Sequence, residues 1–202
     1  MAERKRLRPD LRKQQILDAA VHLFHQVGFE AASLRDLASM VGINKATIYH
    51  YFESKEEILF HIVQKVGDEL LNGVRDASKQ PGRPLGVLEA MIRFQLGYVE
   101  SHTEEIKVLV EEKKSLGADL HKEIRSTEAE IFRLYEEILR RCQSERSVRP
   151  LHLATSAFAI LGQINWLYHW YQPKGSLSIP QLTEEIVTIL FRGLVLDGHG
   201  PA

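Results

Sequence analysis

Basic, hydroxyl and aromatic side chains gather in one short stretch of the chain, between residues 45 and 51. The stretch carries Lys45, Ala46, Thr47, Tyr49, His50 and Tyr51. Side chains of these types donate hydrogen bonds to phosphate oxygens and reach base edges, whereas a helix that meets only water more often carries Glu and Lys. The alternative is a small helix of a compact bundle whose tyrosines cover neighbouring core. The chemistry of the stretch therefore favours a surface that reads nucleic acid.

Two short helices joined by a glycine turn are expected to position this surface. Ser33 is a suitable N-cap for a first helix over residues 34–41, and Asn44 is a suitable N-cap for a second over residues 45–52. Gly42 lies in the turn between them. A helix, a short turn and a second helix form the helix-turn-helix motif, whose second helix enters the major groove of DNA. We therefore predict that residues 45–52 form the DNA-reading helix.

Helical spacing of apolar residues extends over nearly the whole chain, and no segment alternates in the way of a strand. The chain is therefore predicted to be all-α, with about nine helices. The first is expected from Leu11 to Val27, with Gly28 as a left-handed C-cap. The long fourth helix is expected after Ser54 and before the turn at residues 80–84. The remaining helices are predicted at residues 84–101, 103–115, 120–143, 151–171 and 180–196.

The charges of the chain are unevenly distributed. The formal net charge is −1, yet residues 4–13 carry six basic side chains and one acidic side chain. A polyanion such as DNA is therefore expected at the N-terminal end, although a short basic tail can also be a solvated leader. The single cysteine and the lack of an apolar segment behind the basic residues predict a cytoplasmic protein. No stretch approaches the roughly 20 apolar residues of a transmembrane helix.

An enzyme is the competing class, because nine histidines and 27 acidic side chains offer many acid and base groups. No nucleophile, phosphate-binding or dinucleotide-binding motif assembles them, and Cys142 lies in a polar segment without a histidine nearby. His22 and His25 are spaced to share a metal ion, but no clustered Cys or Asp completes a site. We therefore expect no catalytic residues, no metal and no cofactor. A DNA-binding module without a ligand is the second alternative.

A series of short motifs in unbroken order resembles the N-terminal domain of the TetR/AcrR repressors. The motifs are Ile16-Leu17-Asp18-Ala19-Ala20, Leu23-Phe24, Gly28-Phe29, Leu34-Arg35-Asp36-Leu37-Ala38, Val41-Gly42, Thr47-Ile48-Tyr49-His50-Tyr51-Phe52, Lys55-Glu56 and Leu59. The resemblance implies a helix-turn-helix DNA-binding domain over residues 1–55 and a larger helical domain over residues 56–202 that binds a ligand and dimerises. Proteins of this family bind palindromic double-stranded operators as homodimers, and a ligand in the C-terminal domain moves the two reading heads apart.

The family pattern implies DNA contacts for eight residues. They are Arg35, Lys45, Ala46, Thr47, Tyr49, His50, Tyr51 and Lys55. Lys45 and Ala46 would open the reading helix towards base edges. Thr47, Tyr49 and Tyr51 resemble residues that bind phosphate.

Three of these positions have alternatives. Arg35 resembles a residue that reaches a base or a phosphate, but it could pair with Asp36 or Glu30 instead. Lys55 resembles the lysine that holds the DNA backbone, but it could pair with Glu56 or Glu57. His50 could donate to phosphate or cover the interface between the domains.

The helix expected over residues 151–171 is apolar on nearly every face, and the helix over residues 180–196 carries another broad apolar stripe. Small residues such as Ala157 and Gly162 allow another helix to approach closely. Pairing both helices with those of a second copy would form a four-helix interface, as the TetR family does. We therefore predict a homodimer, and the alternative is a core within a single chain.

A ligand pocket is expected among the helices over residues 84–170. The candidates for its lining are Phe94, Tyr98, Leu109, Phe132, Tyr135, Phe158, Asn165, Trp166 and His169. Apolar walls with a few polar groups suit an elongated lipophilic ligand. The segment 162–173, with Gly193-Leu194 later, is similar to the family branch that regulates fatty-acid, aromatic-acid or steroid degradation, which implies an acyl-CoA effector. A drug-like substrate of an efflux pump is the alternative effector.

Overall fold

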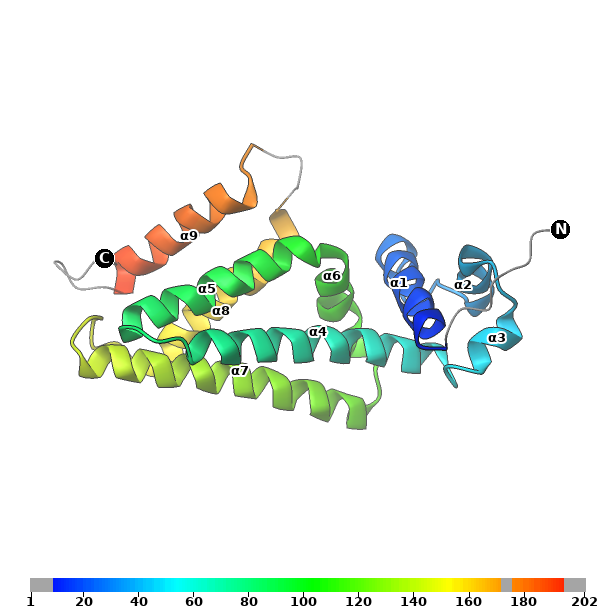
Figure 1. Cartoon of the computed structure of the whole chain (residues 1–202), viewed down its shortest axis with the longest axis horizontal. Coiled ribbons are helices and arrows are strands. Elements are labelled where there is room, and N and C mark those ends of the chain that lie inside the picture. The colour runs from blue at the N-terminus through cyan, green and yellow to red at the C-terminus, as the bar shows by residue number, and fades with distance from the viewer. Residues whose placement is uncertain (1–8, 172–175, 195–202) are drawn as a thin grey trace. The chain divides into compact units, whose positions relative to one another are not determined.

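The structure, a computed structural model, describes residues 9–171 and 176–194. Within these residues it consists of nine α-helices and one 3-10 turn without a β-strand, which confirms the all-α prediction. The elements are α1 (Pro9–Val27), α2 (Leu34–Val41), α3 (Lys45–Tyr49), α4 (Lys55–Ser78), α5 (Pro84–Ser101), α6 (Thr103–Glu112), the 3-10 turn η1 (Lys113–Ser115), α7 (Ala118–Ser144), α8 (Leu153–Trp170) and α9 (Ile179–Leu194) (Figure 1).

The caps that the sequence predicts around α2 and α3 are present. The Oγ of Ser33 accepts a hydrogen bond from the backbone N–H of Asp36 and thereby begins α2. Gly42 ends the same helix with a φ of 68°, a left-handed conformation that glycine adopts without steric penalty. The Oδ1 of Asn44 accepts the N–H of Thr47 at 2.7 Å and begins α3. These local contacts define the turn of the helix-turn-helix.

The reading helix α3 is shorter than predicted, because it ends at Tyr49 rather than at Phe52. The N–H groups of Tyr51 and Phe52 both donate to the carbonyl oxygen of Ile48, so the chain leaves the helix in a tight turn. That turn places Phe52 in the core, where it is 1% exposed.

The later helices lie within about two residues of their predicted bounds, which is the usual uncertainty of helix ends. The helix predicted over residues 103–115 is divided into α6 and η1. The predicted end of the last helix, at residues 195–196, lies outside the described residues. No helix in the described ranges is both long enough and apolar enough to cross a membrane.

The described residues form two compact units. The first contains residues 9–66 and Glu104–Lys122, and the second contains Gly67–Thr103 and the described residues from 123 onwards. The two units meet within α4, between Val66 and Gly67, so this helix contributes residues to both of them. In addition, α6 joins the first unit.

Apolar side chains from four helices form the core of the first unit. Ile16 of α1, Leu37 of α2, Ile48 of α3 and Ile58 of α4 are all fully buried. Such a core holds the two short helices in place through burial, since neither is long enough to be stable alone. The exposed side chains of α3 are therefore displayed from a fixed base.

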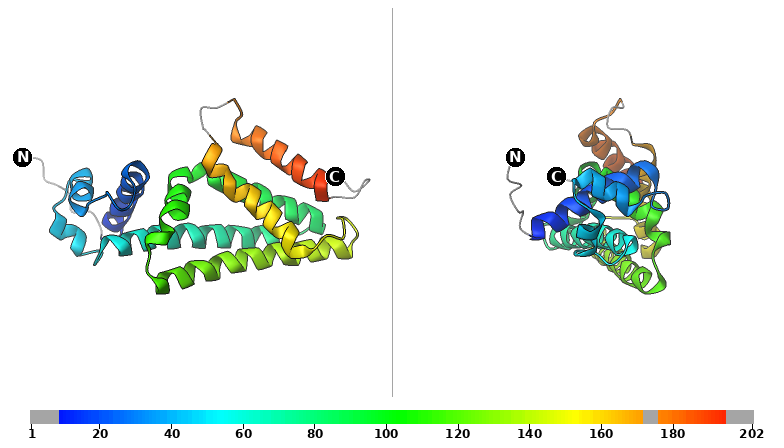
Figure 2. Two further views of the ribbon diagram at one scale, coloured as in Figure 1. Left: turned by 180° about the vertical axis from the view of Figure 1, so that it is seen from behind. Right: turned by 90° about the vertical axis from the view of Figure 1, so that its right-hand side faces the viewer.

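The helix α5 lies against α8 and α9 in the second unit (Figure 2). Its fully buried side chains are Leu88, Met91, Ile92 and Leu96. At the edge of this contact, the guanidinium of Arg93 donates to the carboxylate of Glu184 on α9 at 2.6 Å and to Glu89 at 2.7 Å. The ion pair lowers the pKa of the Glu184 carboxyl.

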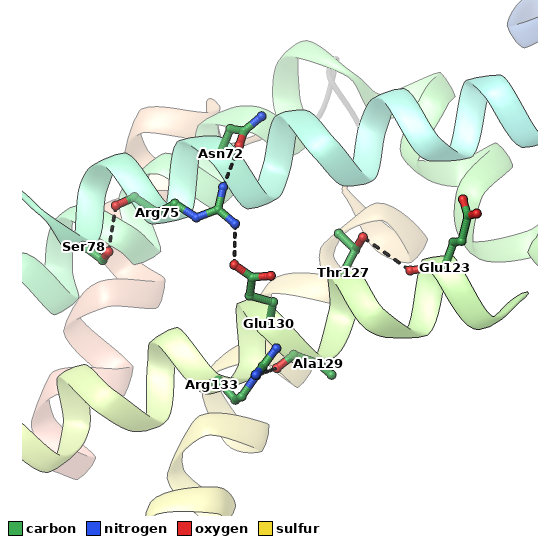
Figure 3. Close-up of polar contacts among 8 residues, drawn as sticks. All are labelled: Asn72, Arg75, Ser78, Glu123, Thr127, Ala129, Glu130 and Arg133. Atoms are coloured by element: carbon green, nitrogen blue, oxygen red, sulfur yellow. Dashed lines mark hydrogen bonds and ion pairs between the residues drawn. The ribbon is translucent and has the colours of Figure 1, made fainter. Parts of the chain in front are cut away.

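A second ion pair joins α4 to α7 in the same unit. The guanidinium of Arg75 donates to the carboxylate of Glu130 and, at 2.9 Å, to the Oδ1 of Asn72 (Figure 3). The hydrogen bond from Arg75 lowers the pKa of the Glu130 carboxyl. Because both partners remain about a third exposed, the pair fixes the register of the helices more than it adds stability.

Candidate nucleic-acid interface and effector site

The exposed face of α3 carries the side chains that the sequence singles out. Lys45, Ala46, Tyr49 and His50 are exposed, and Thr47 and Tyr51 are partly exposed. Ile48, on the inner side, is fully buried and anchors the helix. The Nζ of Lys45 lies 5.5 Å from the centre of the Tyr49 ring, which is a cation–π distance. The face therefore combines a positive charge with an aromatic hydroxyl group.

Two further predicted contacts flank this face. The hydroxyl of Thr47 donates to the Oδ1 of Asn44 at 2.8 Å, so its proton supports the cap of α3. Arg35 is exposed at the start of α2 and forms no ion pair with another side chain in the described ranges. Its alternative partner, Asp36, instead accepts the hydroxyl of Ser33 at 2.5 Å. The guanidinium of Arg35 is therefore open to an external anion.

Lys55, at the start of α4, reaches the loop between α1 and α2. Its Nζ donates to the carbonyl oxygens of Phe29 at 2.6 Å, Ala32 at 3.0 Å and Glu30 at 3.3 Å. It also lies 4.2 Å from the centre of the Phe29 ring. An ammonium group has three N–H donors, and all three are used here. Lys55 therefore does not pair with Glu56, and it holds the loop between α1 and α2.

The helix α6 supports the same loop. The carboxylate of Glu112 accepts the backbone N–H of Phe29 at 3.2 Å, directly after the left-handed cap at Gly28. Near the other end of α6, Glu104 lies 3.4 Å from the Nδ1 of His22 and 3.8 Å from that of His25. These contacts join sequence positions about 80 residues apart, and no local pattern signals them.

Two features bear on the alternative of an enzyme. Burial raises the pKa of the Cys142 thiol to about 11, so the sulfur stays protonated at neutral pH and is a poor nucleophile. Among the described residues, no group of three or more His, Cys, Asp or Glu side chains is placed to hold a metal ion.

The residues predicted to line a ligand pocket occupy three kinds of position. Tyr98 and Tyr135 are buried inside the second unit, and Phe94 and Phe132 are partly buried there. Leu109 belongs to the first unit. The other four, which are Phe158, Asn165, Trp166 and His169, are exposed on α8, with Phe158 and Trp166 more than 60% exposed. The buried face of α8 carries Ile160, Ile164 and Leu167. The ring of Phe158 nevertheless contacts that of Phe132, with ring centres 4.5 Å apart.

Aromatic side chains of α5 line its contact with α4. The ring of Phe94 covers Gly73, where an added Cβ would lie 1.8 Å from the ring. The hydroxyl of Tyr98 donates to the carboxylate of Glu69 at 2.7 Å, and the Tyr98 ring stacks on His102 with ring centres 4.0 Å apart. The sequence prediction included two of these rings but missed their partners on α4.

A buried polar pair was also missed by the sequence analysis. The hydroxyl of Tyr135 on α7 donates to the Oε1 of Gln95 on α5 at 2.5 Å. Burial raises the pKa of the Tyr135 phenol well above its usual range, so the hydroxyl keeps its proton. The available signal was a glutamine on the apolar face of α5, between Met91 and Val99.

A stripe of exposed apolar side chains runs along α8. Phe158, Trp166 and Trp170 share one face at helical spacing, and they are 65%, 61% and 50% exposed. On α9, Ile189 is also 61% exposed. Gly162 lies within the α8 stripe, with no atom within 4 Å of the position a Cβ would take. Contiguous apolar surface of this kind commonly marks a protein contact.

Comparisons with protein families match both parts of the chain. Residues 16–62 match the family described as bacterial regulatory proteins, tetR family, and residues 81–194 match the tetracyclin repressor-like C-terminal domain. The chain therefore belongs to the tetR family, whose members are DNA-binding transcription regulators and not enzymes.

Individual relatives resemble the chain over most of its length. The transcriptional repressor KstR2 of Mycobacterium tuberculosis is 23% identical over 189 residues, which are 93% of this chain and 94% of the repressor. A crystal structure of AibR with isovaleryl coenzyme A and operator DNA is 26% identical, with a TM-score of 0.83 over 90% of this chain and 99% of that chain. The regulator PfmR of Thermus thermophilus is 28% identical, with a TM-score of 0.83 over 88% of this chain and 97% of that chain.

Proposed function

We propose that the protein is a ligand-responsive repressor that acts in the cytoplasm, binds a palindromic operator as a homodimer and releases it when an acyl-CoA binds. The observation that carries the proposal is the exposed face of α3 with Lys45 and Tyr49. Asn44 caps this helix, and the buried Ile48 anchors its inner side. The repressor names of relatives such as KstR2 support the direction of regulation.

In this proposal, residues 1–55 bind the operator and residues 56–202 bind the ligand and dimerise. Lys45 and Ala46 face base edges, while Tyr49, His50 and Tyr51 bind phosphate. Thr47 joins them if its hydroxyl turns away from Asn44. Arg35 reaches a base or a phosphate from α2. The contacts of Lys55 favour a supporting role, in which it shapes the loop behind the reading helix instead of holding the DNA backbone.

Dimerisation is supported by the apolar stripe of α8 and by Ile189 on α9. Phe158 and Trp166 belong to this contact, and Asn165 and His169 lie on the same exposed side of α8, so these four side chains meet the partner helices instead of lining a pocket within one subunit. Covering the two large aromatic side chains would contribute about 1.5–3 kcal/mol each. The exposed Gly162 would let the partner helix approach closely.

The effector class is supported by the relative AibR, whose crystal structure contains isovaleryl coenzyme A and operator DNA. The interior of the second unit, with Phe94, Tyr98 and Tyr135, suits a lipophilic acyl chain. A drug-like efflux substrate is the second candidate effector. A DNA-binding module without any ligand is the second candidate class.

The test uses fluorescently labelled DNA from upstream of the gene, with a random duplex of equal length as control. Fluorescence anisotropy measures binding, and the complex is titrated with isovaleryl-CoA, octanoyl-CoA, palmitoyl-CoA, free CoA, free fatty acids and cationic lipophilic drugs. Release by a thioester but not by free CoA supports the proposal. Release by drugs alone favours the efflux alternative, a complex that responds to nothing favours the ligand-free module, and equal binding to both duplexes contradicts a repressor.

A further inference from the structure

The polar pair between α5 and α7 lies in otherwise apolar surroundings. Tyr135 is 0% exposed and Gln95 is 3% exposed. Residues one helical turn away on the same two helices are buried and apolar, namely Met91, Val99, Ile131 and Leu139. Burial also raises the pKa of the Tyr135 phenol well above its usual range. An amide is costly to place here unless its hydrogen-bonding groups find partners.

Only one end of the Gln95 amide has a partner. Its Oε1 accepts the Tyr135 hydroxyl, but its Nε2, which carries two N–H donors, donates to no residue in the described ranges. Turning the amide over would pair the nitrogen and leave the oxygen alone, so one end stays unpaired in either orientation. No completely covered side-chain nitrogen or oxygen in these ranges lacks a partner, so the Gln95 nitrogen still touches accessible space.

The Nε2 of Gln95 lies in apolar surroundings, so the ligand that suits it is an uncharged hydrogen-bond acceptor bonded to apolar groups. A thioester carbonyl oxygen has this chemistry, because it accepts a hydrogen bond, carries no charge and is followed by an alkyl chain. A carboxylate fits less well, since burying its charge would require a cationic partner, and neither Gln95 nor Tyr135 is one. The buried apolar side chains of Met91 and Val99, one helical turn away on α5, lie on the same face of the helix as Gln95.

We propose that the amide of Gln95 donates a hydrogen bond to the acyl carbonyl oxygen of the effector, and that Tyr135 orients the amide for this contact. The inference rests on the proposed function and adds the group that distinguishes an acyl thioester from other lipophilic molecules. Tyr135 is a positioning residue, because its hydroxyl holds the Oε1 and so directs the Nε2 away from α7.

The test compares a thioester with a matched ligand that lacks the carbonyl. The probes are octanoyl-CoA and S-octyl-CoA, a thioether of the same chain length, and binding is measured by isothermal titration to the full chain. The wild-type protein should bind the thioester about tenfold more tightly or better, because one hydrogen bond to a buried donor is lost with the thioether. Gln95→Leu should bind both probes with equal affinity.

Gln95→Leu alone leaves the buried Tyr135 hydroxyl without its acceptor, which could destabilise the fold. The double variant Gln95→Leu/Tyr135→Phe avoids this, because it replaces the whole polar pair with apolar side chains. It should bind operator DNA like the wild type and still fail to distinguish the two probes. Gln80→Leu, an exposed site after α4, serves as the control and should retain the full preference for the thioester.

Two results would overturn the inference while leaving the repressor proposal intact. The first is equal affinity of the wild type for both probes. The second is a double variant that still prefers octanoyl-CoA over S-octyl-CoA by the wild-type factor, whether or not its affinity for both probes has fallen. If the wild type binds operator DNA but neither probe, and no thioester of another length, then the acyl-CoA effector and the inference both fail.

Discussion

At the scale of single residues, base reading and phosphate binding by Lys45 predict different results. Its ammonium lies over the Tyr49 ring on the exposed face of α3. If it reads a base edge, Lys45→Ala should weaken operator binding by about 1–3 kcal/mol and change binding to random DNA much less. Anisotropy titrations with the two duplexes measure both effects. Equal losses on the two DNAs would place Lys45 among the phosphate contacts.

Lys55 is expected to stabilise the loop between α1 and α2 and not to contact DNA directly. Lys55→Met removes three hydrogen bonds to the loop carbonyls while retaining an unbranched side chain that is one atom shorter, so the free energy of unfolding should fall by about 1–3 kcal/mol. Thermal unfolding measures this change, and Lys65→Met, an exposed site on α4, is the control. The salt dependence of DNA binding should keep its slope. A slope reduced by about one with unchanged stability would show that Lys55 binds a phosphate.

At the scale of the elements, the contact of α4 with α5 depends on the absence of a side chain at Gly73. Alanine normally stabilises a helix interior by about 1 kcal/mol relative to glycine, but here its Cβ would lie 1.8 Å from the Phe94 ring. Gly73→Ala should therefore lower the melting temperature, and the same change in a Phe94→Leu background should be neutral or stabilising. Gly97→Ala, with no atom near its added Cβ, is the control and should stabilise. If the two glycine variants stabilise equally, Phe94 is not held against α4.

Most helices and their caps can be predicted from the sequence, because their signals are local. Contacts between residues far apart in the sequence cannot be predicted in this way. The caps at Ser33, Asn44 and Gly28 depend on residues within four positions, so the sequence displays them directly. The role of Lys55 depends on carbonyls 23 to 26 residues earlier, and the Gln95 pair spans 40 residues. The type of residue alone does not reveal such partners.

The two parts of the candidate site differ in how far the sequence predicts them. The exposed face of α3 follows from helical spacing within one motif, and it was predicted residue by residue. To predict which side chains line a pocket, one must know which face of α5, α7 and α8 is buried, and this depends on tertiary packing. An aromatic residue such as Trp166 is typical both of a pocket and of a subunit contact, so its side of α8 had to come from the structure.

At the scale of the whole molecule, the stripe on α8 should make the protein a dimer. Gly162→Glu places a charge within the stripe without filling any space in the subunit, so it should give folded monomers and lower operator affinity more than tenfold. Ala157 is unsuitable for this test, because it is fully buried within its own subunit. Ala129→Glu, on an exposed position of α7, is the control. Sedimentation of a wild-type monomer at micromolar concentration without DNA would refute the assignment.

The regulation of the molecule is testable as a coupling between its two ligands. A thioester that releases the operator must prefer the conformation that DNA disfavours, and a coupling of about 1–3 kcal/mol corresponds to a 5- to 150-fold change in affinity. Linkage requires the operator to weaken thioester binding by the same factor. Operator titrations with and without saturating octanoyl-CoA, and octanoyl-CoA titrations with and without operator, measure the two factors independently, with free CoA as the control ligand. Agreement between the factors is expected for a repressor with two coupled sites, whereas weakened operator binding with unchanged thioester affinity would mean that the thioester removes DNA by another route.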